Sequence, residues 1–184
     1  AGPSLYVRKS VANHLNDISR DNPDITLRTL RRWDRNNPRT AWIAKRALRT
    51  LIKEGHPGAL TLLGAGEPAK MRIESFTVSP EVITPGEEIR LDAHLTSTAK
   101  KPQRLLIDYL VHYVKQSGGT VGKVFKWKEI ELGPEKTVVL QKRQTIRDFS
   151  TRKHYPGRHR VELQVNGERL AEAAFILEEL AVEL

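Results

Sequence analysis

The chain has 184 residues, enough for one large domain or two small ones, and it contains no cysteine. The lack of cysteine excludes a disulfide framework and thiolate metal sites, and it is compatible with a reducing cytosol. Lys and Arg outnumber Asp and Glu by 31 to 22, so the net charge of +9 favours association with polyanions. No apolar run approaches the length that a membrane span needs.

The basic charge is divided between two blocks of the sequence. Residues 1–67 contain 12 basic and 6 acidic side chains, and residues 99–160 contain 15 and 5. Residues 161–184 reverse the sign, with one arginine against six glutamates. Two separate regions therefore carry a surplus of positive charge that can meet a nucleic acid.

The first 63 residues have the periodicity of helices. Apolar side chains recur at helical spacing near the start, and we expect Val7, Val11, Leu15 and Ile18 to pack one face of a helix. Three short polar turns that end in proline separate the helical stretches, as is normal at a helix entry. The expected helices span residues 4–20, 24–34, 39–54 and 57–63.

The remaining positions of the first helix are unusually polar. Arg8, Asn13, Asn16 and Asp17 stand where propensity favours Ala, Glu or Lys. Asn13 and Asp17 are four residues apart and therefore lie on one side of the helix. This pattern predicts that the helix contacts something polar.

The third expected helix is basic. Lys45 and Arg49 are four residues apart and share one face, and Trp42 and Arg46 share the neighbouring face. Basic stripes on adjacent helices are typical of surfaces that bind polyanions. Two interpretations of Trp42 stay open at this point: a buried anchor, or a platform on which a base stacks.

Beyond a Gly- and Pro-containing linker at residues 64–70, the period of the apolar residues changes to two. Asn166-Gly167, between two alternating runs, is the strongest short-range signal for a hairpin. Seven short strands separated by turns indicate an immunoglobulin-like antiparallel β-sandwich, here without a disulfide. The expected strands span residues 72–78, 88–95, 104–114, 123–132, 136–143, 157–165 and 169–177.

Lys126 and Lys128 flank Trp127 and would share one face of the fourth expected strand. They are candidates for contacts with a DNA backbone, although exposed lysine on an edge strand also guards a sheet against aggregation. The two histidines of the segment 154–159 flank a turn without a carboxylate pair, which is a poor ligand set. We expect no metal site.

Two helical segments resemble a known family. The motif V-R-K-S-V-A-N-H-L-N-D at residues 7–17, followed by D-N-P, resembles the last HEAT-like repeat of DNA alkylation repair glycosylases of the AlkC/AlkD kind. The segment WIAKRALRTLIKEGHPGALTLLG at residues 42–64 resembles the terminal helical pair of the same solenoid. Asn13, where the AlkD branch more typically has an aromatic residue, favours the AlkC branch, whose members can carry an immunoglobulin-like domain.

The resemblance implies a two-domain α + β chain. HEAT-like helical repeats would occupy residues 1–66, and an immunoglobulin-like β-sandwich would occupy residues 67–184. A solenoid needs about three repeats to bury a continuous core, and two helical hairpins are too few. We therefore expect the chain to be the C-terminal piece of a longer protein.

The implied activity is hydrolysis of the N-glycosidic bond of alkylated, cationic bases such as 3-methyladenine, without a cofactor. In the family a carboxylate lies beside the damaged nucleotide, and Asp17 is the candidate here, because an anion stabilises an oxocarbenium-like sugar or positions the attacking water. The alternative is that Asp17 is solvated or pairs with Arg8 or Arg20. The expected DNA-binding residues are Arg8, Lys9, Asn13, Asn16, Lys45, Arg46, Arg49, Lys126 and Lys128.

The implied partner is double-stranded DNA that contains alkylated bases, and we expect a cytoplasmic monomer. Nucleotide-binding and hydrolase motifs such as the Walker loop, G-x-G-x-x-G, H-E-x-x-H and G-x-S-x-G are missing from the sequence. The rival hypothesis is a non-catalytic module that holds DNA or a protein, which would use the basic blocks but not an Asp facing the DNA. A purely structural sandwich would leave the basic blocks unexplained.

Overall fold

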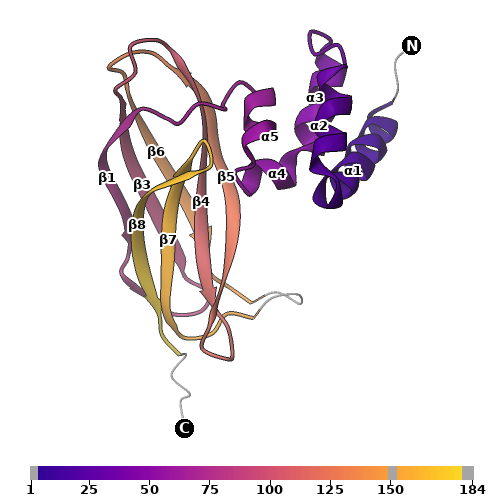
Figure 1. Ribbon diagram of the computed structural model, residues 1–184. Helices are drawn as coiled ribbons and strands as arrows, with labels where there is room; N and C mark the ends of the chain where they lie inside the picture. Colours follow the sequence, from indigo (N-terminus) through magenta and orange to yellow (C-terminus); the bar gives the residue numbers. More distant parts are fainter. Residues whose placement is uncertain (1–3, 149–152, 180–184) are drawn as a thin grey trace. The chain divides into compact units, whose positions relative to one another are not determined.

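The computed structural model describes residues 4–148 and 153–179, which divide into two compact units between Pro68 and Ala69. The first unit is helical and the second consists of strands (Figure 1). None of the helices in the described residues is long and apolar enough to cross a membrane. The helices are α1 (Leu5–Asp21), α2 (Pro23–Arg31), α3 (Pro38–Ala47), α4 (Arg49–Lys53) and α5 (Pro57–Leu62).

Local capping explains where most of these helices begin. The Ser4 hydroxyl accepts from the amide of Val7 at the start of α1, and the Asn37 side chain accepts from the amide of Arg39 at the start of α3. Proline occupies the first helical position of α2, α3 and α5, where its fixed φ suits a helix and no donor is lost. The turns expected from the sequence therefore do separate helices.

The expectation of HEAT-like helical repeats is wrong. The first unit contains one helix of 17 residues and four helices of five to ten residues, and it does not show a repeat of matched helical pairs. Most of the regular structure in the described chain is β-sheet. The helix expected over residues 39–54 is divided at Leu48 into α3 and α4.

The division at Leu48 has a tertiary cause. In a continuous helix the amide of Thr50 would donate to the carbonyl of Arg46. Instead, Asn16 Oδ1 accepts from the Thr50 amide at 3.3 Å and from Thr50 Oγ1 at 3.0 Å. The Arg46 carbonyl accepts from Arg49 Nη1 at 2.8 Å. Side chains that replace the partners of a helical hydrogen bond interrupt the helix at that point.

Helix α1 buries a different face from the one expected. Ala12, Asn16 and Ser19 are buried, whereas Val7 and Val11 are 44% and 37% exposed. The small side chains of Ala12 and Ser19 allow α1 to lie close to its neighbours, which outweighs the burial of two valines. The core of the unit comes from the other helices: Leu27, Leu30, Ala44, Ala47, Leu48, Leu51, Ala59 and Leu62.

The second unit is a β-sandwich, as expected. A three-stranded sheet has the order β1-β3-β6, and a five-stranded sheet has the order β2-β8-β7-β4-β5. All pairs are antiparallel except β2–β8, and β2 was not expected. The strands are β1 (Met71–Ser79), β2 (Val82–Ile83), β3 (Glu88–Ser97), β4 (Gln103–Val114), β5 (Thr120–Leu132), β6 (Thr137–Thr145), β7 (Gly157–Val165) and β8 (Glu168–Leu177).

Polar contacts connect the two sheets in place of a disulfide. Tyr109 of β4 donates to Gln144 Oε1 of β6 at 2.8 Å, and Gln144 Nε2 donates to the Tyr113 hydroxyl at 2.7 Å. Burial raises the pKa of Tyr109 to about 12. Trp127 of β5 packs against Tyr109 and donates from Nε1 to the carbonyl of Gln141 at 3.3 Å. The β5–β6 side of the sandwich is therefore closed by aromatic residues and hydrogen bonds.

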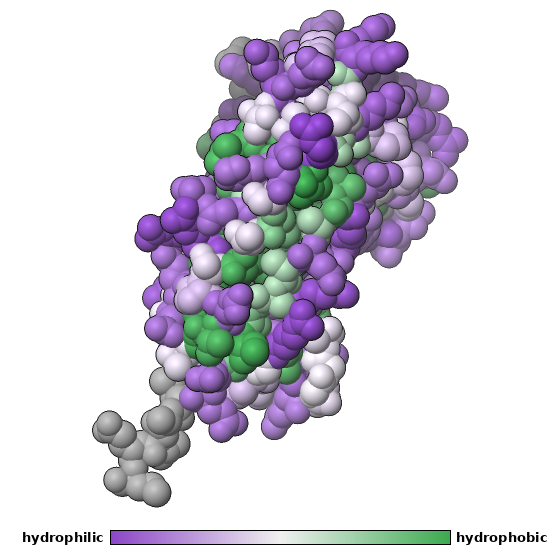
Figure 2. Space-filling view, turned by 90° about the vertical axis from the view of Figure 1, so that its left-hand side faces the viewer, coloured by the Kyte–Doolittle hydropathy of each residue, from purple (hydrophilic) through white to green (hydrophobic). Residues whose placement is uncertain are grey.

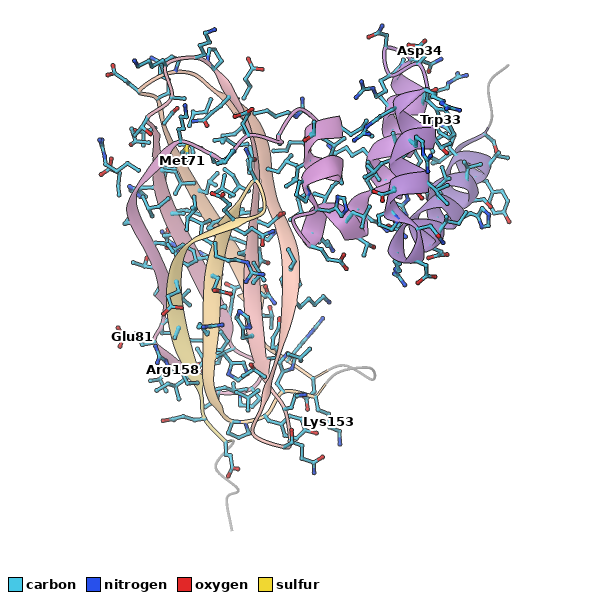
Figure 3. All side chains as sticks on the ribbon, in the orientation of Figure 1. Trp33, Asp34, Met71, Glu81, Lys153 and Arg158 are labelled. Atoms are coloured by element: carbon cyan, nitrogen blue, oxygen red, sulfur yellow. The ribbon has the colours of Figure 1, made fainter. Side chains whose placement is uncertain are left out.

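The opposite side of the sandwich, where β1 and β8 lie, carries exposed apolar residues. Figure 2 shows apolar residues gathered in a band on this side. Val82 and Ile176, each 46% exposed, are register partners where β2 pairs with β8. Met71 at the start of β1 lies at the opposite end of the sandwich from Lys153 and Arg158 (Figure 3).

The hairpin between β7 and β8 has the turn that the sequence predicts. Asn166 and Gly167 have φ values of 48° and 82°, as a type I′ turn requires at both central positions. The Asn166 side chain also continues the pairing with β4, because its Oδ1 accepts from the amide of Leu106 at 2.9 Å and its Nδ2 donates to the carbonyl of Arg104 at 3.1 Å.

Glu162, on the outward face of β7, is the centre of a group of ion pairs. Its Oε2 accepts from Arg169 Nη1 at 2.6 Å, lies 3.9 Å from Arg160 Nη2 and is hydrogen-bonded to His112 Nε2. Burial opposes its ionisation, but the bond to His112 and the charges of the two arginines prevail and lower the pKa of Glu162.

A second titratable group lies in the interior of the sandwich. Burial lowers the pKa of His159, which stacks on Phe175 with ring centres 4.9 Å apart.

We expect the sandwich to lose stability in two steps as the pH falls. The folded state disfavours protonated His159, so the unfolded chain binds more protons below about pH 6.5 and stability decreases from there. Glu162 stays ionised in the fold, so its contribution is present above about pH 4.3 and is lost as the pH falls further. The measurement is the urea midpoint between pH 8 and 4, followed by amide NMR signals of β4 and β7.

The variant His159→Leu should reduce the loss of stability that begins at about pH 6.5 and leave the loss below about pH 4.3 unchanged. Glu162→Gln should do the reverse. If the pH profile of His159→Leu has the same slope between pH 7 and 5 as the unmodified chain, the assignment of that step to His159 is wrong.

Candidate nucleic-acid interface

Two arginines of the helical unit lie over the ring of Trp42. The Cζ atoms of Arg8 and Arg46 are each 5.6 Å from the indole centre. Arg46 reaches the ring because it follows Trp42 by one helical turn in α3, and Arg8 reaches it from α1. Guanidinium groups are attracted to an indole face by its negative potential. Trp42 is only partly buried, so neither of the two interpretations from the sequence describes its contacts completely.

Arg49 connects this group to Asp17. Its guanidinium donates to the Arg46 carbonyl, which fixes it at the division between α3 and α4. Burial lowers the pKa of Arg49, the nearby charge of Arg46 lowers it further, and the charge of Asp17 opposes both effects. Asp17 is exposed on α1 and close enough to Arg49 to influence it electrostatically. The charges of both Arg46 and Asp17 therefore act on Arg49.

The three arginines of this region are not held in salt bridges within the part of the chain that the structure describes. Among the described residues, no carboxylate forms a salt bridge with Arg8, Arg46 or Arg49. The sandwich differs, because six of its arginines form salt bridges with Asp or Glu. The paired arginines are Arg72, Arg90, Arg104, Arg143, Arg160 and Arg169.

The structure brings some of the expected site residues to the surface of α1 and not others. Lys9, Asn13 and Asp17 are exposed. Asn16 is fully buried, and its oxygen is bonded to Thr50. The prediction that Asn16 contacts DNA is therefore corrected: this side chain shapes the division between α3 and α4. The spacing of polar residues along α1 could not distinguish the two roles, because it carries no information on which face a neighbour covers.

The two lysines expected from the sandwich lie on β5, an edge strand of the five-stranded sheet. Lys126 and Lys128 are both exposed and flank Trp127, whose side chain points into the sandwich. Lys126 Nζ lies 3.0 Å from Glu129 Oε2, so its charge is partly neutralised. Lys45 of α3 is partly buried. In residues 4–148 and 153–179, no group of three His, Cys, Asp or Glu side chains could hold a metal ion.

Sequence reasoning missed that Trp42 contacts two arginines. The available signal was the spacing W-x-x-x-R at residues 42–46, which places a cation over the ring within one helix. The contribution of Arg8 had no local signal, because it depends on how α1 packs against α3.

Comparison with known proteins places these features in a family. The family described as the C-terminal immunoglobulin-like domain of the uncharacterised protein YhaZ matches residues 72–179. This chain belongs to that family. YhaZ of Bacillus subtilis (strain 168) is 38% identical over 165 residues, which cover 90% of this chain and 46% of YhaZ.

A solved structure extends the similarity over both units. The alkylpurine DNA glycosylase AlkC of Pseudomonas fluorescens, bound to DNA containing an abasic site analog, is 53% identical, with a TM-score of 0.94. The match covers 97% of this chain and 50% of AlkC, and it confirms the resemblance to the AlkC branch. The chain thus spans about half the length of both relatives. The β-glucosidase EmGH1 of Erythrobacter marinus also matches, over 60% of this chain and 16% of the EmGH1 chain, with a TM-score of 0.52. At 14% identity, this match shows the fold alone.

Proposed function

We propose that this chain supplies the DNA-binding surface and one catalytic carboxylate of a glycosylase that removes alkylated, cationic bases such as 3-methyladenine from double-stranded DNA. The observation that carries the proposal is a group of three arginines that form no salt bridge with the described residues, one of which, Arg49, interacts electrostatically with Asp17. The chain is also 53% identical to a DNA-bound alkylpurine glycosylase. The rival, a module that only holds DNA or protein, gives no role to a carboxylate within this positive region.

The arginines would bind the DNA backbone. Phosphate contacts position a protein on the duplex without specifying sequence, and Arg is well suited to them because its donors match a pair of phosphate oxygens. Arg8, Arg46 and Arg49 have the unpaired charge for this role. Exposed Lys9 and Asn13, and Lys45, would add contacts around them, and Lys126 and Lys128 would offer contacts from the sandwich.

Asp17 would act on the sugar. Loss of an alkylated base leaves positive charge on the deoxyribose, and a nearby anion stabilises that charge or orients the attacking water. A cationic base is already a good leaving group, so this chemistry needs no strong general acid and no cofactor. The exposed position of Asp17 on α1 leaves it accessible to a nucleotide. Arg49, whose charge interacts with that of Asp17, would hold the backbone nearby.

The test combines binding by this chain with base release by the full-length protein. Duplexes that contain 3-methyladenine, an abasic site analog or no lesion are compared. We expect this chain to bind DNA, with affinity that falls steeply as salt rises because counterions are released. We also expect the full-length protein to release 3-methyladenine in a single turnover. Binding without release would support the non-catalytic module instead, and absence of both would refute the proposal.

A further inference from the structure

We propose that Arg8, Trp42 and Arg46 form a clamp for a single DNA backbone phosphate, with Trp42 as the positioning residue. We refer to these three residues as the arginine clamp. The inference rests on the proposed function, since it identifies which groups bind the backbone and how they are held. It adds a residue, Trp42, that contributes no charge of its own.

The geometry brings two cations to one small region. Each Cζ atom lies 5.6 Å from the same indole centre, so the two guanidinium groups cannot be further apart than twice that distance. The Nε atoms of Arg8 and Arg46 are both buried and have no hydrogen-bond partner among the described residues. The terminal amino groups of both side chains also form no hydrogen bond with the described residues, which leaves these donors available for a ligand.

Holding two cations together in this way is unfavourable in the free protein. The charges repel each other, and partial burial strengthens that repulsion relative to water. The indole face offsets only part of this cost. At Glu162 in the sandwich, by contrast, three basic side chains surround a carboxylate. The arginine clamp has no such internal anion, so an external one would relieve the repulsion.

A backbone phosphodiester is an anion that suits this arrangement. It carries one negative charge and two non-bridging oxygens, which two planar guanidinium groups can bind with parallel hydrogen bonds. Arg8 precedes Asp17 by nine residues in α1, which is roughly 14 Å along the helix axis at 1.5 Å per residue. This is the axial length of about four base-pair steps. Because nine residues also turn the helix by about 180°, the clamp would hold the backbone on the other side of α1, a few nucleotides from the target base.

The decisive experiment is the salt dependence of DNA binding for variants of this chain. Trp42→Leu keeps both arginines, so a change in its binding reports their positions rather than their number. We expect the slope of log affinity against log salt to fall by about one for Trp42→Leu, because one phosphate contact is lost. Arg8→Ala and Arg46→Ala should each have a similar effect, and the double variant should lose little more than either single one.

Two controls make the result specific. Trp42→Phe keeps an aromatic face and should retain most of the original slope, and equal helicity of Trp42→Leu and the unmodified chain separates the loss of the clamp from misfolding. Arg72→Ala removes an arginine that is already paired with Glu74 at 2.7 Å, and it should leave the slope unchanged.

An unchanged slope in Trp42→Leu, or additive losses for Arg8 and Arg46, would overturn the clamp. Base release by the full-length protein would then still stand as evidence for the proposed function. Absence of DNA binding by the unmodified chain would refute both.

Discussion

Replacing Asp17 by Asn is expected to lower the single-turnover rate of 3-methyladenine release by on the order of 10²–10³ while DNA binding is retained or strengthened. The substitution keeps the size of the side chain and most of its hydrogen bonding, but it removes the anion that would face a positively charged transition state. The exposed position of Asp17 means that folding should be unaffected. Loss of a negative charge near Arg49 should also make the surface more attractive to phosphate.

The measurement is single-turnover base release by the full-length protein, together with affinity for the same duplex. A matched control is Asp21→Asn, which removes an exposed carboxylate one helical turn further along α1 and should leave release unchanged. Equal rates of base release for Asp17→Asn and the unmodified protein would show that Asp17 takes no part in the reaction. Parallel loss of release and binding would indicate a structural role instead.

Replacing Asn166 by Ala is expected to destabilise the sandwich by about 3 kcal/mol. Two effects add: alanine at φ of 48° costs roughly 1–2 kcal/mol, and the loss of bonds to Leu106 and Arg104 leaves backbone groups of β4 without a partner. Urea unfolding, followed by amide signals of β4 and β8, measures the change. Asn166→Gly separates the two effects, because glycine adopts the positive φ without strain.

The glycine variant should therefore be more stable than the alanine variant and less stable than the unmodified chain. If the glycine and alanine variants have equal stability, the positive φ contributes nothing. If the glycine variant matches the unmodified chain, the bonds to β4 contribute nothing.

Local patterns were sufficient for much of the strand unit. The hairpin at Asn166 was predictable because a type I′ turn requires two residues that tolerate positive φ, and Asn-Gly supplies both within two positions. The β-sandwich was predictable because alternation of apolar residues is a property of each strand alone. The two-residue strand β2 was not, because it is too short to show alternation and depends on pairing with β8.

The helical unit shows the opposite case. Helix entries at Pro23, Pro38 and Pro57 follow from the backbone of single residues, and the sequence places all three correctly. The periodicity of residues 39–54 gives no sign of a break at Leu48, since the break depends on a hydrogen bond from Thr50 to Asn16 across 34 residues. The expected HEAT-like repeat came from the family resemblance, and the short helices of this unit do not form it.

The candidate site also depends partly on local sequence and partly on tertiary packing. Residue types and their helical spacing drew attention to Arg46 and Arg49, and the resemblance to the AlkC/AlkD family added Asp17 as the candidate carboxylate. Only the packing of α1 against α3 and α4 distinguishes exposed Asp17 from buried Asn16, although the two are adjacent in the chain. The same packing brings Arg8 to the ring of Trp42. Spacing along a helix specifies which side chains share a face, but a tertiary neighbour decides whether that face is covered or left to a ligand.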